Sequence, residues 1–456
     1  MSILLLFACR GGPTPDDSLV ADSSSDSHPL TAPGTVLWFT VDTMNEDWLL
    51  DATYDASPNH QRIFDEGVVL ENTVVTRGIT IESLPSMATG TYRRTHGVHD
   101  TVVPDDMPSM IQEYYADAGF RTFGYSSNFC EVIGSRGWER FYCTGPGSME
   151  GGDLERDSLL TERLLADLEE VGEEPLFIWI HVRDPHANHT PRDPWLSEFW
   201  GDRPLELGPV STEDLSQIML GTSEKPEGFD EWLEAVYASE LASDDAMLGE
   251  IVAALEESGR WDDTLVVTGT DHGEEMGAHD DYYFHGCSPY DTVMNTTWAI
   301  RSPGLSPGVV EDHVSTIDIV PTVLSLSGLS PGPDVEGVDI VPLLRGESQA
   351  RPPVFFERGE AAAGVVDGTR KYFMQAVDTP FRGCSPYSEA QPYPGPTEGL
   401  WELSTDPDEL DNLVSSEDPT AEKTLICEWV TEKTWVDAEL DDQNRLVAAC
   451  KAHLGI

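Results

Sequence analysis

The sequence is poor in basic residues. Its 456 residues include only 26 lysines and arginines against 83 aspartates and glutamates, which gives a formal net charge of −57 at pH 7. A surface this acidic repels polyanions, so it argues against nucleic acids and anionic membrane surfaces as partners. It also opposes an anionic substrate unless a local cation, most simply a metal ion, offsets the field. Solubility or adaptation to salt is the simpler explanation of the charge.

The sequence also lacks a long apolar run, since no stretch approaches the roughly 18 apolar residues of a membrane-spanning helix. The chain opens M-S-I-L-L-L-F-A-C, which resembles the end of a bacterial lipoprotein signal with Cys9 as the lipidated residue. No Lys or Arg precedes this short run, so a chance match is the alternative. We expect residues 1–9 to be a signal remnant and residues 10–34, rich in Pro, Asp and Ser, to be a disordered linker. The protein would then be exported to the bacterial periplasm or outer cell envelope, with a lipid anchor at Cys9.

Cysteine is scarce, with seven residues and no C-x-x-C pair, which disfavours a thiolate zinc site. If Cys9 is lipidated, the other six permit three disulfides, which would agree with export. Scattered buried thiols are the alternative. Nearness in sequence favours the pairs Cys130–Cys143 and Cys427–Cys450, and leaves Cys287 with Cys384.

Apolar segments typical of buried strands alternate with amphipathic helical patterns. Residues 35–41, 175–181 and 264–269 are continuous apolar runs, which fit a sheet covered on both faces. Strands that alternate with helices predict an α/β fold with a mostly parallel sheet, whose ligands bind at the carboxyl ends of the strands. The helical patterns, most of them ending at a glycine, cover residues 109–118, 154–171, 227–258 and 315–328.

The pattern changes after about residue 346. Short apolar runs at residues 354–356, 371–376 and 400–403 lie among turns rich in Pro and Gly. They predict a small antiparallel sheet, which a further helix follows. We therefore expect a large α/β domain over residues 35–345 and a smaller α+β subdomain over residues 346–456.

Acidic residues and a histidine follow two of the predicted strands. Asp42 comes directly after the first strand, and Asp271 and His272 follow residues 264–269. Hard divalent cations prefer carboxylate oxygens, and imidazole adds affinity for zinc or manganese. The three residues are therefore a candidate site for one divalent cation, Ca²⁺ or Mg²⁺ before Mn²⁺ or Zn²⁺. A helix-capping role for Asp42 is the alternative.

Ser83 opens the segment S-L-P-S-M-A-T-G at the expected start of a helix, where main-chain N–H groups favour an anion. A serine beside a metal becomes a nucleophile when the metal lowers its pKa. Simple helix capping is the alternative. Histidines also gather after predicted strands and helices, which indicates a polar cleft. They are His96, His99, His181, His186, His189, His279 and His285.

These segments together resemble the sulfatase family of the alkaline-phosphatase-like superfamily. T-V-L-W-F-T-V-D-T-M resembles its first strand and metal-binding Asp, and S-L-P-S-M-A-T-G-T-Y-R-R-T-H-G-V its nucleophile segment. W-I-H-V-R-D-P-H resembles the segment of an active-site His, and D-D-T-L-V-V-T-G-T-D-H-G-E-E the second metal-binding segment. V-S-T-I-D-I-V-P-T-V-L-S-L-S-G and L-W-E-L-S-T-D-P-D-E-L-D-N-L extend the likeness to residue 415. The resemblance implies the family's fold, with a mostly parallel sheet between helices and a smaller C-terminal subdomain.

The resemblance also implies roles for single residues. Ser83 would be a nucleophile on the cation, and His186 and His285 would face the substrate's anionic group or its leaving group. A slip of two residues in the alignment would move the last role from His285 to Cys287. The remaining implied positions are Asp42, Asp271 and His272 as metal ligands, and His96 and His181 as supporting or structural residues.

Two departures from the family pattern bear on the chemistry. Thr43 stands where many members have a second Asp, and Met87 replaces the Arg of the motif in which Cys or Ser becomes formylglycine. Formylglycine releases sulfate by elimination, whereas the sulfate ester of an unmodified Ser cannot be cleaved by this route. The phosphate ester of an unmodified Ser can be hydrolysed by a metal-activated water. An unmodified Ser83 would therefore favour phosphate, phosphonate or phosphodiester substrates.

We accordingly predict a metal-dependent sulfuric or phosphoric ester hydrolase, in which Ser83 or its formylglycine attacks the anionic group in line. The substrate would be a small anionic ester or a sulfated or phosphorylated glycan or lipid. One alternative is a phosphodiesterase, phosphonate hydrolase or phospho-group transferase of the cell envelope. Another is a sulfatase-like binding protein without catalysis.

Overall fold

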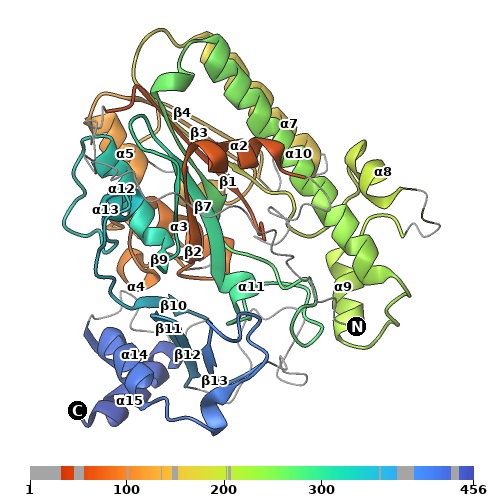
Figure 1. The fold of residues 1–456 in the computed structure, drawn as a ribbon, viewed down its shortest axis with the longest axis vertical. Helices are drawn as coiled ribbons and strands as arrows, with labels where there is room; N and C mark the ends of the chain where they lie inside the picture. Colours follow the sequence, from red (N-terminus) through yellow and green to blue (C-terminus); the bar gives the residue numbers. More distant parts are fainter. Residues whose placement is uncertain are drawn as a thin grey trace, which may run out of the picture.

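The computed structural model describes residues 32–45, 56–99, 102–134, 136–145, 153–201, 203, 207–358, 361–376, 395–432 and 441–456. Within these residues, nine strands form one large sheet and four form a small antiparallel sheet (Figure 1). The large sheet contains β1 (Thr35–Val41), β2 (Val68–Val74), β3 (Arg121–Ser126), β4 (Arg140–Cys143), β5 (Leu176–Val182), β6 (Thr264–Thr270), β7 (Asn295–Arg301), β8 (Gly308–Val310) and β9 (Val314–Ser315).

Helices cover both faces of the large sheet (Figure 1). The described α-helices of this part are α2 (Pro58–Glu66), α3 (Thr80–Thr89), α4 (Arg93–His96), α5 (Ile111–Asp117), α6 (Cys130–Ile133), α7 (Asp153–Glu169), α8 (Trp195–Trp200), α9 (Thr212–Met219), α10 (Phe229–Glu257), α11 (Asp291–Met294), α12 (Ile319–Leu326) and α13 (Val341–Leu344).

The strand order of the large sheet is β4-β3-β5-β1-β6-β7-β2-β8, with β9 also paired to β2. Strand β7 runs antiparallel to β6 and β2, and the other pairs are parallel. In the three central strands, Val41 of β1 pairs with both Val182 of β5 and Thr270 of β6. The residues that follow these three positions therefore emerge together at one edge of the sheet.

The side chains of the central strands alternate between two apolar cores. On β1, Val36 and Trp38 pack in the core that includes residues of α3, α5 and α12. Leu37 and Phe39 pack in the opposite core with residues of α2, α7 and α10. Both cores are buried, which explains why the central strands are apolar without alternation and confirms the predicted α/β fold.

The predicted elements agree closely with the observed ones. The strand expected over residues 35–41 is β1, and the other two expected central strands are β5 and β6, shifted or extended by one residue. The pattern over residues 315–328 starts with a short 3-10 helix, Thr316–Asp318, before α12. Ser315 and Asp318 form a capping box there, which satisfies main-chain groups at the start of the segment.

The C-terminal part contains the predicted small antiparallel sheet. Its strands run in the order β10 (Val354–Glu357), β11 (Ala362–Asp367), β12 (Arg370–Gln375) and β13 (Glu398–Glu402). Helices α14 (Thr420–Glu432) and α15 (Asp441–Leu454) lie beside this sheet (Figure 1). The domain boundary near residue 345 stays a prediction.

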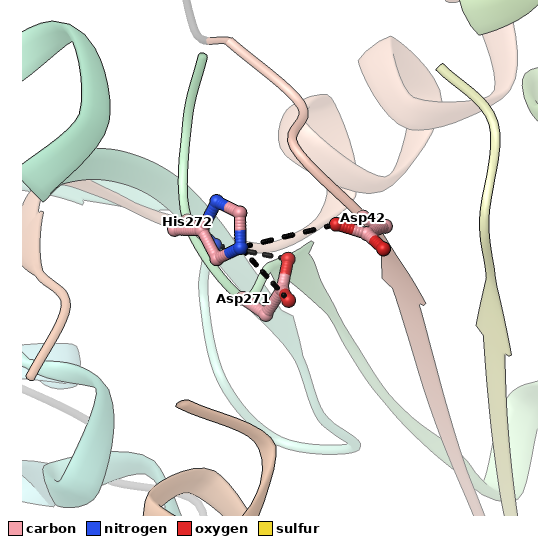
Figure 2. Close-up of side chains that lie close together, drawn as sticks. All are labelled: Asp42, Asp271 and His272. Atoms are coloured by element: carbon pink, nitrogen blue, oxygen red, sulfur yellow. Dashed lines mark hydrogen bonds and ion pairs between the residues drawn. The ribbon is translucent and has the colours of Figure 1, made fainter. Parts of the chain in front are cut away.

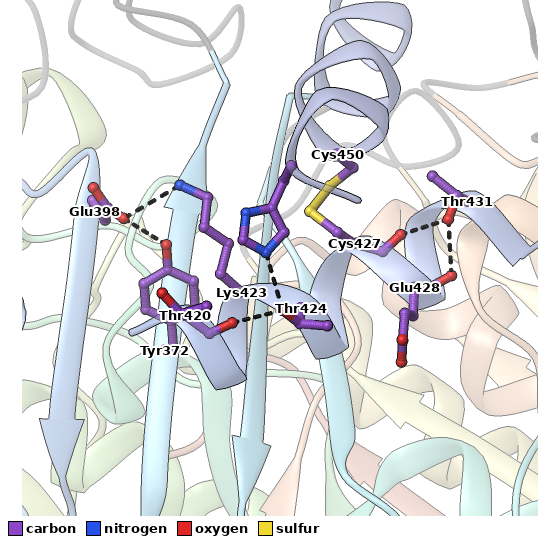
Figure 3. Close-up of a disulfide and its surroundings, with 10 residues drawn as sticks. Tyr372, Glu398, Thr420, Lys423, Thr424, Cys427, Glu428, Thr431 and Cys450 are labelled. Atoms are coloured by element: carbon purple, nitrogen blue, oxygen red, sulfur yellow. Dashed lines mark hydrogen bonds and ion pairs between the residues drawn. A yellow bond between two sulfur atoms is a disulfide. The ribbon is translucent and has the colours of Figure 1, made fainter. Parts of the chain in front are cut away.

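Two disulfides join the pairs that nearness in sequence favours. Cys130–Cys143 links α6 to β4, and Cys427–Cys450 links α14 to α15 (Figure 3). Cys287 is disulfide-bonded as well, and its expected partner Cys384 lies outside the described residues. Cys9 and most of the expected linker also lie outside them. Among the described helices, none has both the length and the apolar character needed to cross a bilayer.

Candidate active site

Three side chains meet at the carboxyl edge of the large sheet. Asp42 follows β1, and Asp271 and His272 follow the adjacent β6. Nε2 of His272 lies 3.9 Å from Oδ1 of Asp42 and 3.5 Å from Oδ2 of Asp271 (Figure 2). One ligand atom from each residue lies within 4.8 Å of the others, and all three side chains are buried. The structure thus brings together the three residues predicted as metal ligands.

The donor set of this cluster fits a divalent cation. Burial raises the pKa of Asp42 to about 7, with Asp271 adding repulsion, and burial likewise raises the pKa of Asp271 to about 7. Oδ2 of Asp271 has no hydrogen-bond partner among the described residues. Nδ1 of His272 lies 3.0 Å from the carbonyl oxygen of Gly273, to which it donates when Nε2 carries the lone pair. A cation bound here would allow both carboxylates to remain charged.

Thr43 supports this cluster through its main chain. Its N–H donates to Oδ1 of Asp271 over 3.3 Å, and its backbone has a φ of 57°. The Thr43 hydroxyl has no hydrogen-bond partner in the described structure. A neutral side chain therefore replaces the second Asp of many family members, and the carboxylates that meet here are those of Asp42 and Asp271.

Helix α3 begins three residues earlier than expected, at Thr80 rather than Ser83. The residue before it, Ile79, is extended, and its carbonyl accepts from the N–H of Ser83. Ser83 consequently lies within the first turn, where its hydroxyl donates to the main-chain oxygen of Asp271 over 2.7 Å. This corrects the expectation that Ser83 starts the helix.

Thr80, at the start of α3, contacts the metal-ligand candidates instead. Its Oγ1 lies 3.2 Å from Oδ1 of Asp42 and 3.1 Å from Nε2 of His272. A hydrogen bond from Thr80 also opposes the rise in the pKa of Asp271. The hydroxyl that contacts both Asp42 and His272 is thus that of Thr80.

A histidine pair lies beside the cluster. The ring of His285 is centred 4.3 Å from that of His272 and 5.1 Å from that of His186. Nδ1 of His285 lies 3.0 Å from a carboxylate oxygen of Glu274. Burial lowers the pKa of His285 to about 4 and the pKa of His186 well below its usual range, so both rings are neutral near pH 7. Because Cys287 is disulfide-bonded, its sulfur cannot serve as a free thiol in the site. His285 is therefore the candidate of that segment for contact with the substrate.

Two other predicted residues have their hydrogen-bond partners outside the cluster. Nε2 of His96 lies 3.0 Å from the Ser86 hydroxyl, and Nδ1 of His96 accepts from the N–H of Val98. Nδ1 of His181 lies 3.0 Å from the Thr40 hydroxyl on β1. Both rings are fully buried, and burial lowers the pKa of each to about 3. Their contacts fit the supporting or structural role expected of them.

Besides Thr80, sequence reasoning missed two further polar residues near the site. Nδ2 of Asn128 donates to Oδ2 of Asp42 over 2.8 Å. Nη2 of Arg183 lies 2.9 Å from Nδ1 of His186, and its charge lowers the pKa of Asp42. Arg183 directly follows β5, in register with Asp42 after β1, and this register was the signal that could have identified it.

The site is deepest at the ligand cluster. Asp42, Asp271 and His272 have no exposed surface, whereas Arg183, His186 and His285 are half-buried. The solvent-facing side of the site is therefore the side of Arg183 and the two histidines.

The chain is similar in sequence to proteins named as sulfatases. Arylsulfatase K of Mus musculus is 28% identical over 188 residues, covering 40% of this chain and 32% of that protein, so the match spans about a third of the relative's length. Choline-sulfatase of Rhizobium meliloti (strain 1021) is 23% identical over 389 residues, covering 79% of this chain and 71% of that protein.

Solved structures share the fold. Phosphonate monoester hydrolase SpPMH from Silicibacter pomeroyi has a TM-score of 0.68 at 18% identity, covering 89% of this chain and 97% of that one. A protein solved with its substrate D-glucosamine-2-N,6-O-disulfate has a TM-score of 0.65 at 15% identity, covering 93% and 98%. The family model described as Sulfatase matches residues 35–329, from β1 through α12, and the chain therefore belongs to the sulfatase family.

Proposed function

We propose that this chain is a metal-dependent hydrolase of phosphate or phosphonate esters whose nucleophile is the hydroxyl of Thr80. The observation that carries the proposal is the position of Thr80 Oγ1, 3.2 Å from Asp42 and 3.1 Å from His272. Ser83 is the competing nucleophile, but its hydroxyl is engaged with the main chain of Asp271.

The identity of the nucleophile bears on the substrate. Formylglycine forms from Cys or Ser, so a Thr nucleophile would remain a plain hydroxyl. Such a hydroxyl forms a stable sulfate ester, whereas its phosphate ester can be hydrolysed because phosphoryl transfer depends mainly on positioning and electrostatics. Thr80 therefore favours phosphate and phosphonate esters over sulfate esters.

Asp42, Asp271 and His272 would hold the cation, which when bound lowers the pKa of a nearby hydroxyl and offsets charge on the anionic group. Thr80 Oγ1 would attack the phosphorus atom, with its proton lost to the departing alcohol, and a water molecule would then hydrolyse the phosphothreonine ester and restore the hydroxyl. Arg183 would attract the anionic group on the solvent-facing side, where the global charge repels it. The half-buried rings of His186 and His285 would line the space beside the departing oxygen.

Sulfate-ester hydrolysis through Ser83 or its formylglycine is the second candidate. It is favoured by relatives named as arylsulfatase K and choline-sulfatase, and by a structural neighbour bound to a sulfated sugar. On either chemistry, we propose an anionic ester, free or on a glycan or lipid, as the substrate class. We also propose export to the cell envelope, with the cysteine pairs compatible with an oxidising compartment.

The test compares Thr80→Ala, Ser83→Ala and, as a matched control, Thr80→Ser. Each full-length variant is assayed with aryl phosphate, phosphonate and sulfate esters in Mg²⁺, Ca²⁺, Mn²⁺ or Zn²⁺. We expect Thr80→Ala to lose about 10³-fold or more in kcat on the phospho-esters, and Thr80→Ser to retain activity.

Mass spectrometry of the peptide with both hydroxyls distinguishes the alternatives. An unmodified peptide, with Ser83→Ala active, would support Thr80. Formylglycine at Ser83, or sulfate turnover lost only in Ser83→Ala, would contradict the proposal and establish the sulfatase route. Absence of turnover by the cation-loaded protein on every ester would favour the non-catalytic alternative.

A further inference from the structure

A second cluster of buried carboxylates includes Asp184, the residue next to Arg183 in sequence. Asp157 lies on α7, Asp184 follows β5, and Asp244 lies on α10. All three have no exposed surface, and one carboxylate oxygen from each lies within 4.8 Å of the others. The three elements that carry them are far apart in sequence, so the tertiary fold creates this cluster.

Asp244 lacks the contacts that a buried carboxylate requires. Neither of its carboxylate oxygens has a hydrogen-bond partner among the described residues, although the side chain is fully buried. Buried polar groups normally have partners, because removing one from water without compensation costs about 1–3 kcal/mol or more. A group from outside the polypeptide could supply the contacts that the Asp244 carboxylate lacks.

The other two carboxylates are held in position by the chain. Asp157 accepts from the main-chain N–H of Arg183 over 3.2 Å and of Asp184 over 3.1 Å. Oδ2 of Asp184 accepts from Nε of Arg192 over 2.9 Å and also from its Nη2. These contacts orient two of the three side chains, whereas Asp244 has no hydrogen bond among the described residues.

The local charges do not balance. Arg192 contacts one of the three aspartates, while the nearby carboxylate of Glu240 adds a fourth negative charge. His189, which contacts Glu240, has its pKa lowered to about 4 by burial and is neutral near pH 7. Burial and the charges of Asp184, Asp157 and Glu240 raise the pKa of Asp244, whereas the charge of Arg192 lowers it. A cation bound here would therefore offset repulsion among the carboxylates.

We propose that Asp157, Asp184 and Asp244 bind a second hard divalent cation, Ca²⁺ or Mg²⁺. The donors are all carboxylate oxygens, which hard cations prefer, and no imidazole or thiolate belongs to the set to favour zinc. This cation ties α7 and α10 to the segment after β5. Because Asp184 lies between Arg183 and His186 in sequence, the cation also holds the segment that carries those two residues.

Metal counting on the full chain tests the site. The protein and its variants are loaded with Ca²⁺ or Mg²⁺, gel-filtered, and analysed for bound metal. We expect the wild type to retain two cations per chain, and Asp244→Asn and Asp42→Asn to retain one each. The matched control is Glu250→Gln, which removes an exposed carboxylate from the same helix and should retain two. Equal metal content in the wild type and Asp244→Asn would overturn the proposal.

A second measurement covers the case in which Asp244→Asn folds poorly. In the Asp42→Asn background, added Ca²⁺ or Mg²⁺ should raise the Tm in a saturable manner, because a ligand that binds only the folded state stabilises it. A Tm that does not respond to either cation would overturn the proposal. So would an Asp244→Asn variant that is more stable than the wild type with unchanged metal content, since protonated carboxyls would then occupy the cluster.

Discussion

The Thr80 hydroxyl lies 3.1 Å from Nε2 of His272, where the start of α3 meets the end of β6. The two residues are separated by 192 positions in sequence. Their contact places the hydroxyl at the N-terminus of α3, next to the proposed cation ligands. The first N–H groups of a helix favour anions. The proposed site would therefore combine a nucleophile, a cation and an anion-binding helix start at one point of an otherwise acidic protein.

Replacing Asn128 should weaken cation binding without removing a ligand. Its side chain donates to Asp42 over 2.8 Å and so orients that carboxylate. We expect Asn128→Ala to raise the Kd of the active-site cation by about 10–100-fold, as the loss of a partner of a ligand does elsewhere. Calorimetric titration measures this value. Asn72→Ala, whose amide bonds an exposed main-chain oxygen, is the control, and an equal Kd in both variants would contradict the expectation.

Arg183 should contribute mainly to substrate binding. It lies on the solvent-facing side of the site and contacts His186. We expect Arg183→Ala to raise KM more than it lowers kcat, with partial rescue by Arg183→Lys, because the positive charge is retained there. Steady-state kinetics on the best phospho-ester of the panel measure both constants. A loss confined to kcat would argue that Arg183 acts on the transition state alone.

Salt should assist the binding of an anionic substrate. The net charge of −57 repels the substrate at long range, whereas the cation and Arg183 attract it at short range. Ions at physiological strength screen interactions beyond about 8 Å, so they weaken the repulsion more than the attraction. We expect KM to fall as NaCl is raised from near zero to moderate strength. A KM that rises steeply with added NaCl would show that long-range repulsion by the surface carboxylates does not weaken substrate binding.

His96 should make stability depend on pH. Burial lowers the pKa of its ring to about 3, whereas an unfolded histidine titrates near 6.5. Below pH 6.5 the unfolded state therefore binds a proton that the folded state does not, and stability is lost as the pH falls. Relative to His96→Gln, the wild type should lose about 1.4 kcal/mol of unfolding free energy per pH unit between pH 6 and 4. Denaturant unfolding of both proteins measures the difference, and parallel curves would contradict it.

The disulfide between Cys427 and Cys450 should stabilise the C-terminal helices. It joins α14 to α15 (Figure 3). The Thr424 hydroxyl also lies 3.0 Å from Nε2 of His453. We expect the double variant Cys427→Ala and Cys450→Ala to lose about 2–4 kcal/mol of unfolding free energy. Limited proteolysis and thermal unfolding check this, with activity on small esters unchanged. Unaltered protease sensitivity in this region would count against the disulfide's role.

The sequence by itself determined the central strands, the family and the three ligand candidates. Each of these depends on local pattern: a buried parallel strand is a continuous apolar run, and the residue after it is placed at the sheet edge. Asp42, Asp271 and His272 were predictable for this reason, since β1 and β6 are adjacent and in register. The two short-range disulfides were predictable because their cysteines are close in sequence.

The tertiary structure alone decided which hydroxyl faces the ligands and which distant carboxylates meet. Helix α3 starts at Thr80 because the extended Ile79 precedes it, and a shift of three residues in that start exchanges one hydroxyl for the other. Asp157, Asp184 and Asp244 come together because α7 and α10 pack on the same face of the sheet. Such contacts depend on how separate elements pack, and this long-range packing leaves no periodic signal in the sequence around any one of the residues.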